Sequence, residues 1–214
     1  MSVIFLAIFF VFTSLHLYGS AKQNKRLRNL TKPFLLSSLF GFYFFTAGNA
    51  LPSILIALFF CWLGDILLMK SAMKWLIAGG ISFMIGHVFF MIGYSRDITF
   101  SSEHLLPALL LAALFVFAAI SIFLKMKPDL PQSMVIPMIG YLLINAAMNC
   151  FAILRMISMP GIPAFITCIG AMQFFVSDSF WFYVRFKKEG RLKTHFWIML
   201  TYSLGELMII IGLI

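Results

Sequence analysis

Charged residues are scarce in this chain of 214 residues: 11 % are Asp, Glu, Lys or Arg, and only seven residues are acidic. Because 62 % of the residues are hydrophobic, the composition excludes an ordinary soluble globular domain. The three cysteines lie in apolar runs without CxxC spacing, which indicates small buried side chains rather than a disulfide framework. The chain has no GxSxG, no HExxH and no phosphate-binding glycine loop, and its four histidines are scattered. No metal site and no cofactor are therefore predicted.

Apolar segments fill most of the chain. About 20 apolar residues suffice to cross a bilayer core of roughly 30 Å. Eight such segments are predicted, at 2–19, 33–48, 51–69, 75–94, 105–124, 133–154, 163–183 and 195–214. The connections are short, so we expect an all-α integral membrane protein: a single polytopic domain over 1–214, folded as one bundle of about eight transmembrane helices. Residues 1–19 lack a basic leading region, which favours a first span over a cleaved signal peptide.

The net charge of +9 is distributed unevenly over the loops. Fourteen of the sixteen basic residues fall in the first, third, fifth and seventh loops, and only Arg96 and Arg155 fall in the others. The positive-inside rule then predicts a cell-membrane protein with cytoplasmic basic loops and both termini outside. The charge is explained by topology, so the expected partner is the lipid bilayer and not nucleic acid. The sequence leaves the oligomeric state open.

Three acidic residues lie inside apolar segments: Asp65 in CWLGDILLM, Asp178 in FFVSDSFWF, and Glu206. A carboxylate is costly in a membrane helix, so such residues normally face a protein interior or a wet cavity. The rise of a helix puts Asp65 and Asp178 roughly 6 Å and 7 Å below the predicted cytoplasmic boundary. The two carboxylates are therefore expected to lie at one depth on one side of the membrane.

The TKPF segment is expected to open the second span, with Thr31 as helix cap and Pro33 at the first helical position. Lys32 would then reach the two aspartates from the same membrane face. A snorkelling anchor is the usual explanation for an isolated lysine at a helix end, and it is the alternative for Lys32.

A deeper layer of polar groups is predicted from helical spacing. Its members are His87, Asn145, Asn149 and Glu206. By helical spacing, Tyr94 shares a stripe with His87, Tyr141 a face with Asn145 and Asn149, and Tyr202 a face with Glu206. Hydrogen bonds between helices would explain these groups, and so would the wall of a cavity. The third and fourth segments also share an order of features with the seventh and eighth: an acidic residue, a basic loop, and a helix with a polar group at mid-depth.

Two carboxylates in a low-dielectric pocket need not share one protonation state, because burial and mutual repulsion disfavour two negative charges. One acid and one base would then be available at neutral pH. Glycosidases use such a pair to protonate an ether oxygen and to stabilise the resulting oxocarbenium ion. Acid-catalysed cleavage of a labile ether is therefore one hypothesis for the pair Asp65 and Asp178.

Several segments, in order, resemble the YhhN-like family of multi-pass membrane proteins, which includes the animal lysoplasmalogenases. They are TKPFLL, LGDILLM, GGISFMIGHVFFMIGY, GAMQFFVSDSFWFYVRF and the region of Tyr202. The chain departs from the expected pattern at Glu206, where the family is expected to carry Gln. The resemblance implies an ether hydrolase that cleaves the vinyl-ether bond of lysoplasmalogens, releasing a fatty aldehyde and the glycerophospho-headgroup.

The resemblance also implies roles for the candidate residues. Asp65 and Asp178 would be the general acid and the group that stabilises the cation or orients water, in either order. Lys32 would neutralise the lipid phosphate or tune an aspartate, and His87 would support the pocket or relay protons. Further supporting or substrate-binding candidates are Tyr94, Asn145, Asn149, Ser177, Tyr202 and Glu206.

Two other functions fit the same residues. A proton-coupled transporter is possible because intramembrane Asp, Glu and His also form proton relays. A non-catalytic lipid-binding membrane protein is possible because helix packing alone could use many of these polar groups.

Overall fold

The part of the chain that the structure describes contains eight α-helices, as the apolar segments predict. The computed structural model describes residues 1–99, 101–187 and 194–214, and these contain no β-strand. The helices are α1 (Ser2–Ala21), α2 (Lys25–Thr46), α3 (Pro52–Leu68), α4 (Met73–Ser95), α5 (Ser102–Met126), α6 (Gln132–Ser158), α7 (Ile162–Lys187) and α8 (Thr194–Ile211), with a short 3-10 helix η1 (Lys127–Asp129) after α5.

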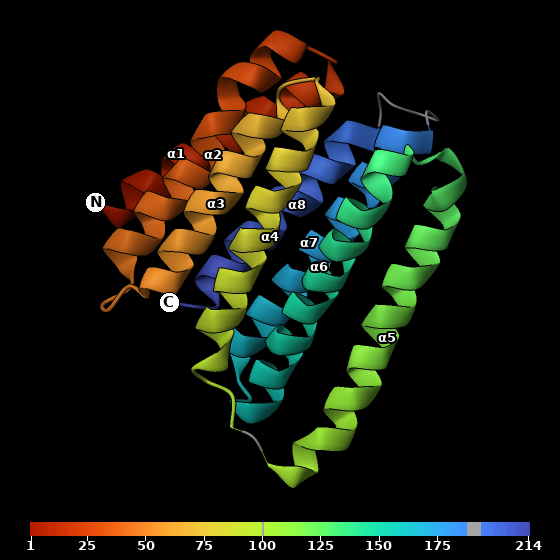
Figure 1. Ribbon diagram of the computed structural model, residues 1–214. Helices are drawn as coiled ribbons and strands as arrows, with labels where there is room; N and C mark the ends of the chain where they lie inside the picture. The colour runs from red at the N-terminus through yellow and green to blue at the C-terminus, as the bar shows by residue number, and fades with distance from the viewer. Residues whose placement is uncertain (100, 188–193) are drawn as a thin grey trace.

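Five of these helices, α1, α4, α5, α6 and α7, are long and apolar enough to cross a membrane, and α3 and α8 are shorter apolar helices. The fold is that of an all-α multi-pass membrane protein. Figure 1 shows the helices side by side in one bundle, with the two termini at the same end. Helix α5 lies along one edge of the bundle and packs on α6 and α7.

Glycines allow close contacts between neighbouring helices. Gly79 and Gly86 of α4 face α3, where an added Cβ would lie 3.3 Å from the carbonyl oxygen of Gly64 or 2.7 Å from Sγ of Cys61. A Cβ built on Gly170 of α7 would lie 2.7 Å from the carbonyl oxygen of Gly205 in α8. Small residues let membrane helices approach this closely. The pairs α3–α4 and α7–α8 are therefore held together by backbone contact.

The predicted start of the second helix is wrong. Asn24, and not Thr31, caps α2: its side chain accepts a hydrogen bond from the backbone N–H of Leu27 at 3.1 Å. Thr31 lies inside the helix, with its hydroxyl 2.8 Å from the carbonyl oxygen of Leu27. Pro33 is likewise internal, and its carbonyl accepts a hydrogen bond from Nε1 of Trp62 at 2.9 Å. The polar first turns extend the helix because Asn24 supplies the cap that the apolar pattern does not reveal.

Arg155 is not a loop residue, contrary to the reading of the loop charges. Helix α6 continues to Ser158, and Arg155 is buried within it. Its Nε lies 2.7 Å from Oδ2 of Asp97, and its Nη1 donates to Oγ1 of Thr167 at 2.9 Å. The guanidinium is tolerated there because both partners satisfy it, and it ties the segment after α4 to α6 and α7.

Replacing Gly170 with Ala is expected to destabilise the protein by about 1–3 kcal/mol, because the added methyl group must push α7 away from the α8 backbone. Gly48→Ala is the matched control, since no atom lies within 4 Å of a Cβ at that position. Thermal unfolding of the detergent-solubilised variants measures the difference. An equal loss in both variants would contradict the close packing of α7 on α8.

Candidate functional site

A pocket of about 300 Å³ lies inside the bundle, near the end where α3 and α7 finish and where α2, α4, α6 and α8 begin. All six of these helices contribute to its wall. Most lining side chains are apolar, and the polar or charged ones are Lys32, Asp65, Tyr141, Ser177, Asp178 and Tyr202. The two aspartates that the sequence singles out thus face a common cavity.

Asp65 is buried in the last turn of α3, and both of its carboxylate oxygens are bound. Nζ of Lys32, from α2, lies 3.0 Å from Oδ1. The hydroxyl of Tyr202, from α8, donates to Oδ2 at 2.9 Å. One carboxylate therefore joins three helices, and Lys32 is an ion-pair partner rather than only an anchor at a helix end.

Asp178 on α7 has a different set of partners. The hydroxyl of Tyr141 donates to its Oδ2 at 2.5 Å, and Nδ2 of Asn145 donates to the same oxygen at 2.8 Å. Tyr141 and Asn145 are one turn apart on α6, so a single helical face holds the carboxyl group. Nδ2 of Asn149, one turn further along, donates to the carbonyl oxygen of Asn145 at 3.0 Å. The polar face predicted for the sixth helix is therefore a binding surface for Asp178.

The two carboxyl groups differ in charge environment. An ammonium group at hydrogen-bond distance favours an ionised carboxylate, and Asp65 has one in Lys32. The described partners of Asp178 are neutral, and none of them binds its Oδ1. One pocket thus holds the Asp65 carboxylate, which is paired with an ammonium group, and the Asp178 carboxyl group, whose Oδ1 has no partner among the described residues.

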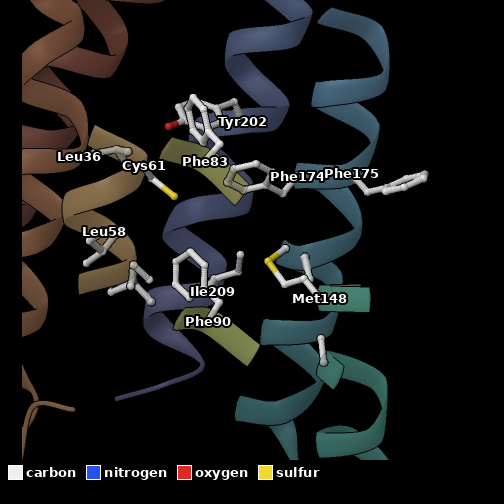
Figure 2. Close-up of a cluster of buried hydrophobic side chains, with 14 of the residues drawn as sticks. Leu36, Leu58, Cys61, Phe83, Phe90, Met148, Phe174, Phe175, Tyr202 and Ile209 are labelled. Carbon is white, nitrogen blue, oxygen red and sulfur yellow. The ribbon is translucent and has the colours of Figure 1, made fainter. Parts of the chain in front are cut away.

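Aromatic rings close the pocket on the side of the bundle centre. Figure 2 shows Phe83, Phe174 and Tyr202 close together between α4, α7 and α8. The ring centroid of Tyr202 lies 5.4 Å from that of Phe174 and 6.3 Å from that of Phe83. Phe83 and Tyr202 also line the pocket, so these rings separate it from the groups that lie deeper in the bundle.

A model of the YhhN family matches residues 27–213. The chain belongs to the YhhN family. Every segment on which the resemblance rests lies within the matched region. No curated protein and no solved structure matches the chain.

The remaining predicted residues of this YhhN-family protein lie outside the pocket or have structural contacts. The hydroxyl of Ser177 lines the pocket but donates to the carbonyl oxygen of Ile198 at 2.9 Å, which links α7 to α8. Tyr94 is fully buried on α4, on the same face as His87 but further along the helix. Its ring stacks on Phe90, with the ring centroids 6.1 Å apart. Asn149 reaches the site only through Asn145.

His87 and Glu206 form the deeper part of the predicted polar layer, and neither lines the pocket. The His87 ring packs edge-on against Phe174 and Tyr141, with centroids 4.9 Å and 5.6 Å away. Both side chains are completely buried, and neither has a hydrogen-bond partner for its nitrogens or oxygens in the described part of the chain. The thiol of Cys61 lies against the Glu206 carboxyl group.

The pocket reaches the outer surface of the bundle between α4 and α6. Two of its lining residues, Ile81 and Ile136, are 50 % and 81 % exposed, so they form its rim. Gly80 and Gly140 lie beside them on the same two helices and leave the rim open. An added Cβ on Gly80 would have no atom closer than 4.0 Å.

Sequence reasoning missed a group of polar side chains behind Lys32. His16, Ser20, Arg28 and His195 lie at the ends of α1, α2 and α8 and interact with one another. The spacing of His16 and Ser20, one turn apart, was the only local signal. Nothing in the sequence pairs His16 with His195, because the contact depends on how α8 docks against α1.

Lys32→Met is expected to destabilise the protein by about 3 kcal/mol, because it leaves the Asp65 carboxylate buried without its cation. The double variant Lys32→Met/Asp65→Asn should recover most of this loss, since no buried charge remains. Lys25→Met is the control: Lys25 is exposed on the same helix. Thermal unfolding in detergent measures the stabilities of the wild type and of these three variants. Equal stabilities of the Lys32 and Lys25 variants would show that the ion pair is not structurally important.

Proposed function

We propose that this YhhN-family protein is a membrane-embedded hydrolase that cleaves the vinyl-ether bond of lysoplasmalogen-type lysophospholipids. The products would be a fatty aldehyde and the glycerophospho-headgroup. The observation that carries the proposal is the shared pocket of Asp65 and Asp178, in which one carboxyl group is paired with Lys32 and the other is held by neutral donors. This is the division of roles that acid-catalysed ether cleavage needs.

Asp178 is the better candidate for the general acid. Tyr141 and Asn145 both bind its Oδ2, so Oδ1 is the atom that can carry a proton. The pocket around it is mostly apolar, and an apolar site favours the neutral acid. Asp65 has both oxygens bound and an ammonium group beside it, so it is the better candidate for the permanent carboxylate.

The reaction balances with these two groups and one water molecule. Asp178 gives its proton to the alkenyl carbon that is not bound to oxygen, and the neighbouring carbon and the ether oxygen share the resulting positive charge. The Asp65 carboxylate stabilises this oxocarbenium ion by its charge. Water adds to the charged carbon, and the proton that it loses returns to Asp178. The hemiacetal then collapses to the aldehyde and the free hydroxyl group of the headgroup.

The shape of the pocket supports a lipid substrate. Its apolar lining suits an alkenyl chain, and its rim at Ile81 and Ile136 lies on the outer surface of the bundle, where lipid would surround a membrane protein. The topology predicted from the loop charges would put this rim in the cytoplasmic leaflet. A lysolipid could then enter sideways, with its ether at the depth of the aspartates.

Asp178→Asn and Asp65→Asn are each expected to lower kcat for a lysoplasmenyl lipid by about 10²–10⁴-fold, because each removes a charge or a proton that the reaction needs. Release of fatty aldehyde by the purified protein in detergent measures the rate. Glu103→Gln is the matched control, since Glu103 is exposed in the first turn of α5.

The outcomes separate the candidate functions. Turnover that survives either aspartate substitution would contradict the proposed roles of the carboxyl groups. Tight binding of vinyl-ether lysolipids without any turnover by the wild-type protein would instead favour a lipid-binding protein.

Gly80→Phe is expected to raise KM for a long-chain lysolipid at least about ten-fold, because the ring would fill the rim between α4 and α6. Gly80→Ala should change KM little, since its methyl group meets only Cδ2 of Tyr141 at 4.0 Å. Both variants need the same assay and a check of thermal stability. Unchanged kinetics in the Phe variant would mean that substrate reaches the aspartates by another route.

Proton-coupled transport is a second candidate function, and one observation favours it. Glu206 and His87 are completely buried deeper than the pocket, and their polar atoms lack hydrogen-bond partners among the described residues. Intramembrane groups of this kind occur in proton relays. Proton movement into proteoliposomes that depends on Glu206, in a protein without aldehyde-releasing activity, would favour transport over hydrolysis.

A further inference from the structure

A network of two imidazoles and two hydroxyl groups lies behind the Lys32–Asp65 ion pair, where α1 ends and α2 and α8 begin. Oγ1 of Thr31 lies 3.0 Å from Nδ1 of His16, and Oγ of Ser20 lies 3.1 Å from Nδ1 of His195. The Ser20 hydroxyl also donates to the carbonyl oxygen of His16 at 2.9 Å. The two rings are 6.0 Å apart, so three helices hold a pair of histidines in fixed positions.

This network is used by nothing in the proposed reaction. None of its members lines the pocket that contains the aspartates. His16 is 1 % exposed, yet its Nε2 has no hydrogen-bond partner in the described part of the chain. A buried polar atom without a partner is costly, which makes it a candidate for a ligand contact.

The charge around the two imidazoles has one sign. The charged side chains that interact electrostatically with both rings are Arg28 and Lys32. Among the described residues, no acidic side chain has such an interaction with either ring. The ion pairs of the described residues join Lys32 to Asp65 and Arg155 to Asp97, so Arg28 has no carboxylate partner there. Its Nε is buried without a hydrogen-bond partner. A guanidinium group that has no carboxylate partner among the described residues, and whose Nε is buried, favours an anion at this site.

We propose that Arg28, His16 and His195 bind a phosphate group, with Ser20 and Thr31 positioning the two imidazoles and Lys32 beside them. A guanidinium fork and an imidazole suit a tetrahedral oxyanion, and basic pockets between membrane helices bind lipid headgroups. The source of this phosphate rests on the proposed function: it is the phosphate of the lysolipid substrate. Lys32 contacts Asp65 at 3.0 Å, so the site adjoins the reaction pocket, and in a lysolipid the glycerol backbone alone separates phosphate from ether.

Binding of an uncleavable ligand pair tests the site without any hydrolysis. The probes are a saturated alkyl-ether lysophosphocholine and the alkylglycerol with the same chain, which lacks only the phosphocholine headgroup. Arg28→Gln and His195→Gln are each expected to weaken the phosphate-containing probe about ten-fold and to leave the alkylglycerol within about two-fold. Fluorescence of Trp181, which lines the pocket, reports occupancy by either probe.

Arg26→Gln is the matched control, because Arg26 is exposed in the first turns of the same helix and its loss changes the net charge equally. Arg28→Lys keeps the charge but loses the guanidinium fork, so its affinity for the phosphate-containing probe is expected to lie between those of the wild type and Arg28→Gln. It replaces Arg28→Gln in the test if that variant does not fold. Glycerol 3-phosphate is expected to compete with the lysophosphocholine probe. If inorganic phosphate competes equally well, the site is one for free phosphate and not for a lipid headgroup.

Equal weakening of both probes, or equal effects of Arg26→Gln and Arg28→Gln, would overturn the phosphate site. These outcomes do not depend on turnover. Failure of the vinyl-ether assay would remove the proposed reaction, while selective loss of the phosphate-containing probe would still establish the anion site.

Discussion

The buried ion pair between Lys32 and Asp65 is the interaction on which the arrangement of this bundle depends. A carboxylate inside an apolar bundle is tolerated only where its partners are complete, and Asp65 has Lys32 from α2 and Tyr202 from α8. Three helices must therefore keep one register at one end of the bundle. Asp178 imposes the same constraint on α6 and α7 through its bonds to Tyr141 and Asn145. The chemistry of the pocket follows from the difference between these two sets of partners.

Two helix pairs contribute to the pocket in a similar way. In α3–α4 and in α7–α8, glycines bring the helices into backbone contact, the first helix carries the aspartate, and the second carries an aromatic ring that faces the pocket. Those rings, Phe83 and Tyr202, lie 6.3 Å apart. The residue after the packed glycine of each second helix is a buried polar one, His87 after Gly86 and Glu206 after Gly205. The order of features noted in the sequence thus corresponds to a repeated packing unit.

Much of the fold could be predicted because long apolar segments have few alternatives in a membrane protein. The predicted segments correspond to the eight helices, and the errors are at polar boundaries. Helix α2 begins at Asn24 and not Thr31, because a side-chain cap can start a helix in a basic stretch. Arg155 was placed in a loop because its charge suggested water, yet Asp97 and Thr167 satisfy it inside the protein. The local pattern of a sequence cannot show which residues of distant helices will be the partners of a charged side chain.

The sequence by itself determined the helical membrane fold. It also predicted one depth for Asp65 and Asp178 and a common side from which Lys32 approaches them. Hydropathy, loop charge and helical rise are local properties, so they need no knowledge of which helices touch. Only the tertiary structure decided that Asp65 pairs with Lys32 while Asp178 is bound by Tyr141 and Asn145. It alone brought His16, Arg28 and His195 together behind that pair. These contacts depend on the docking of helices far apart in the chain, and side-chain spacing along one helix cannot reveal them.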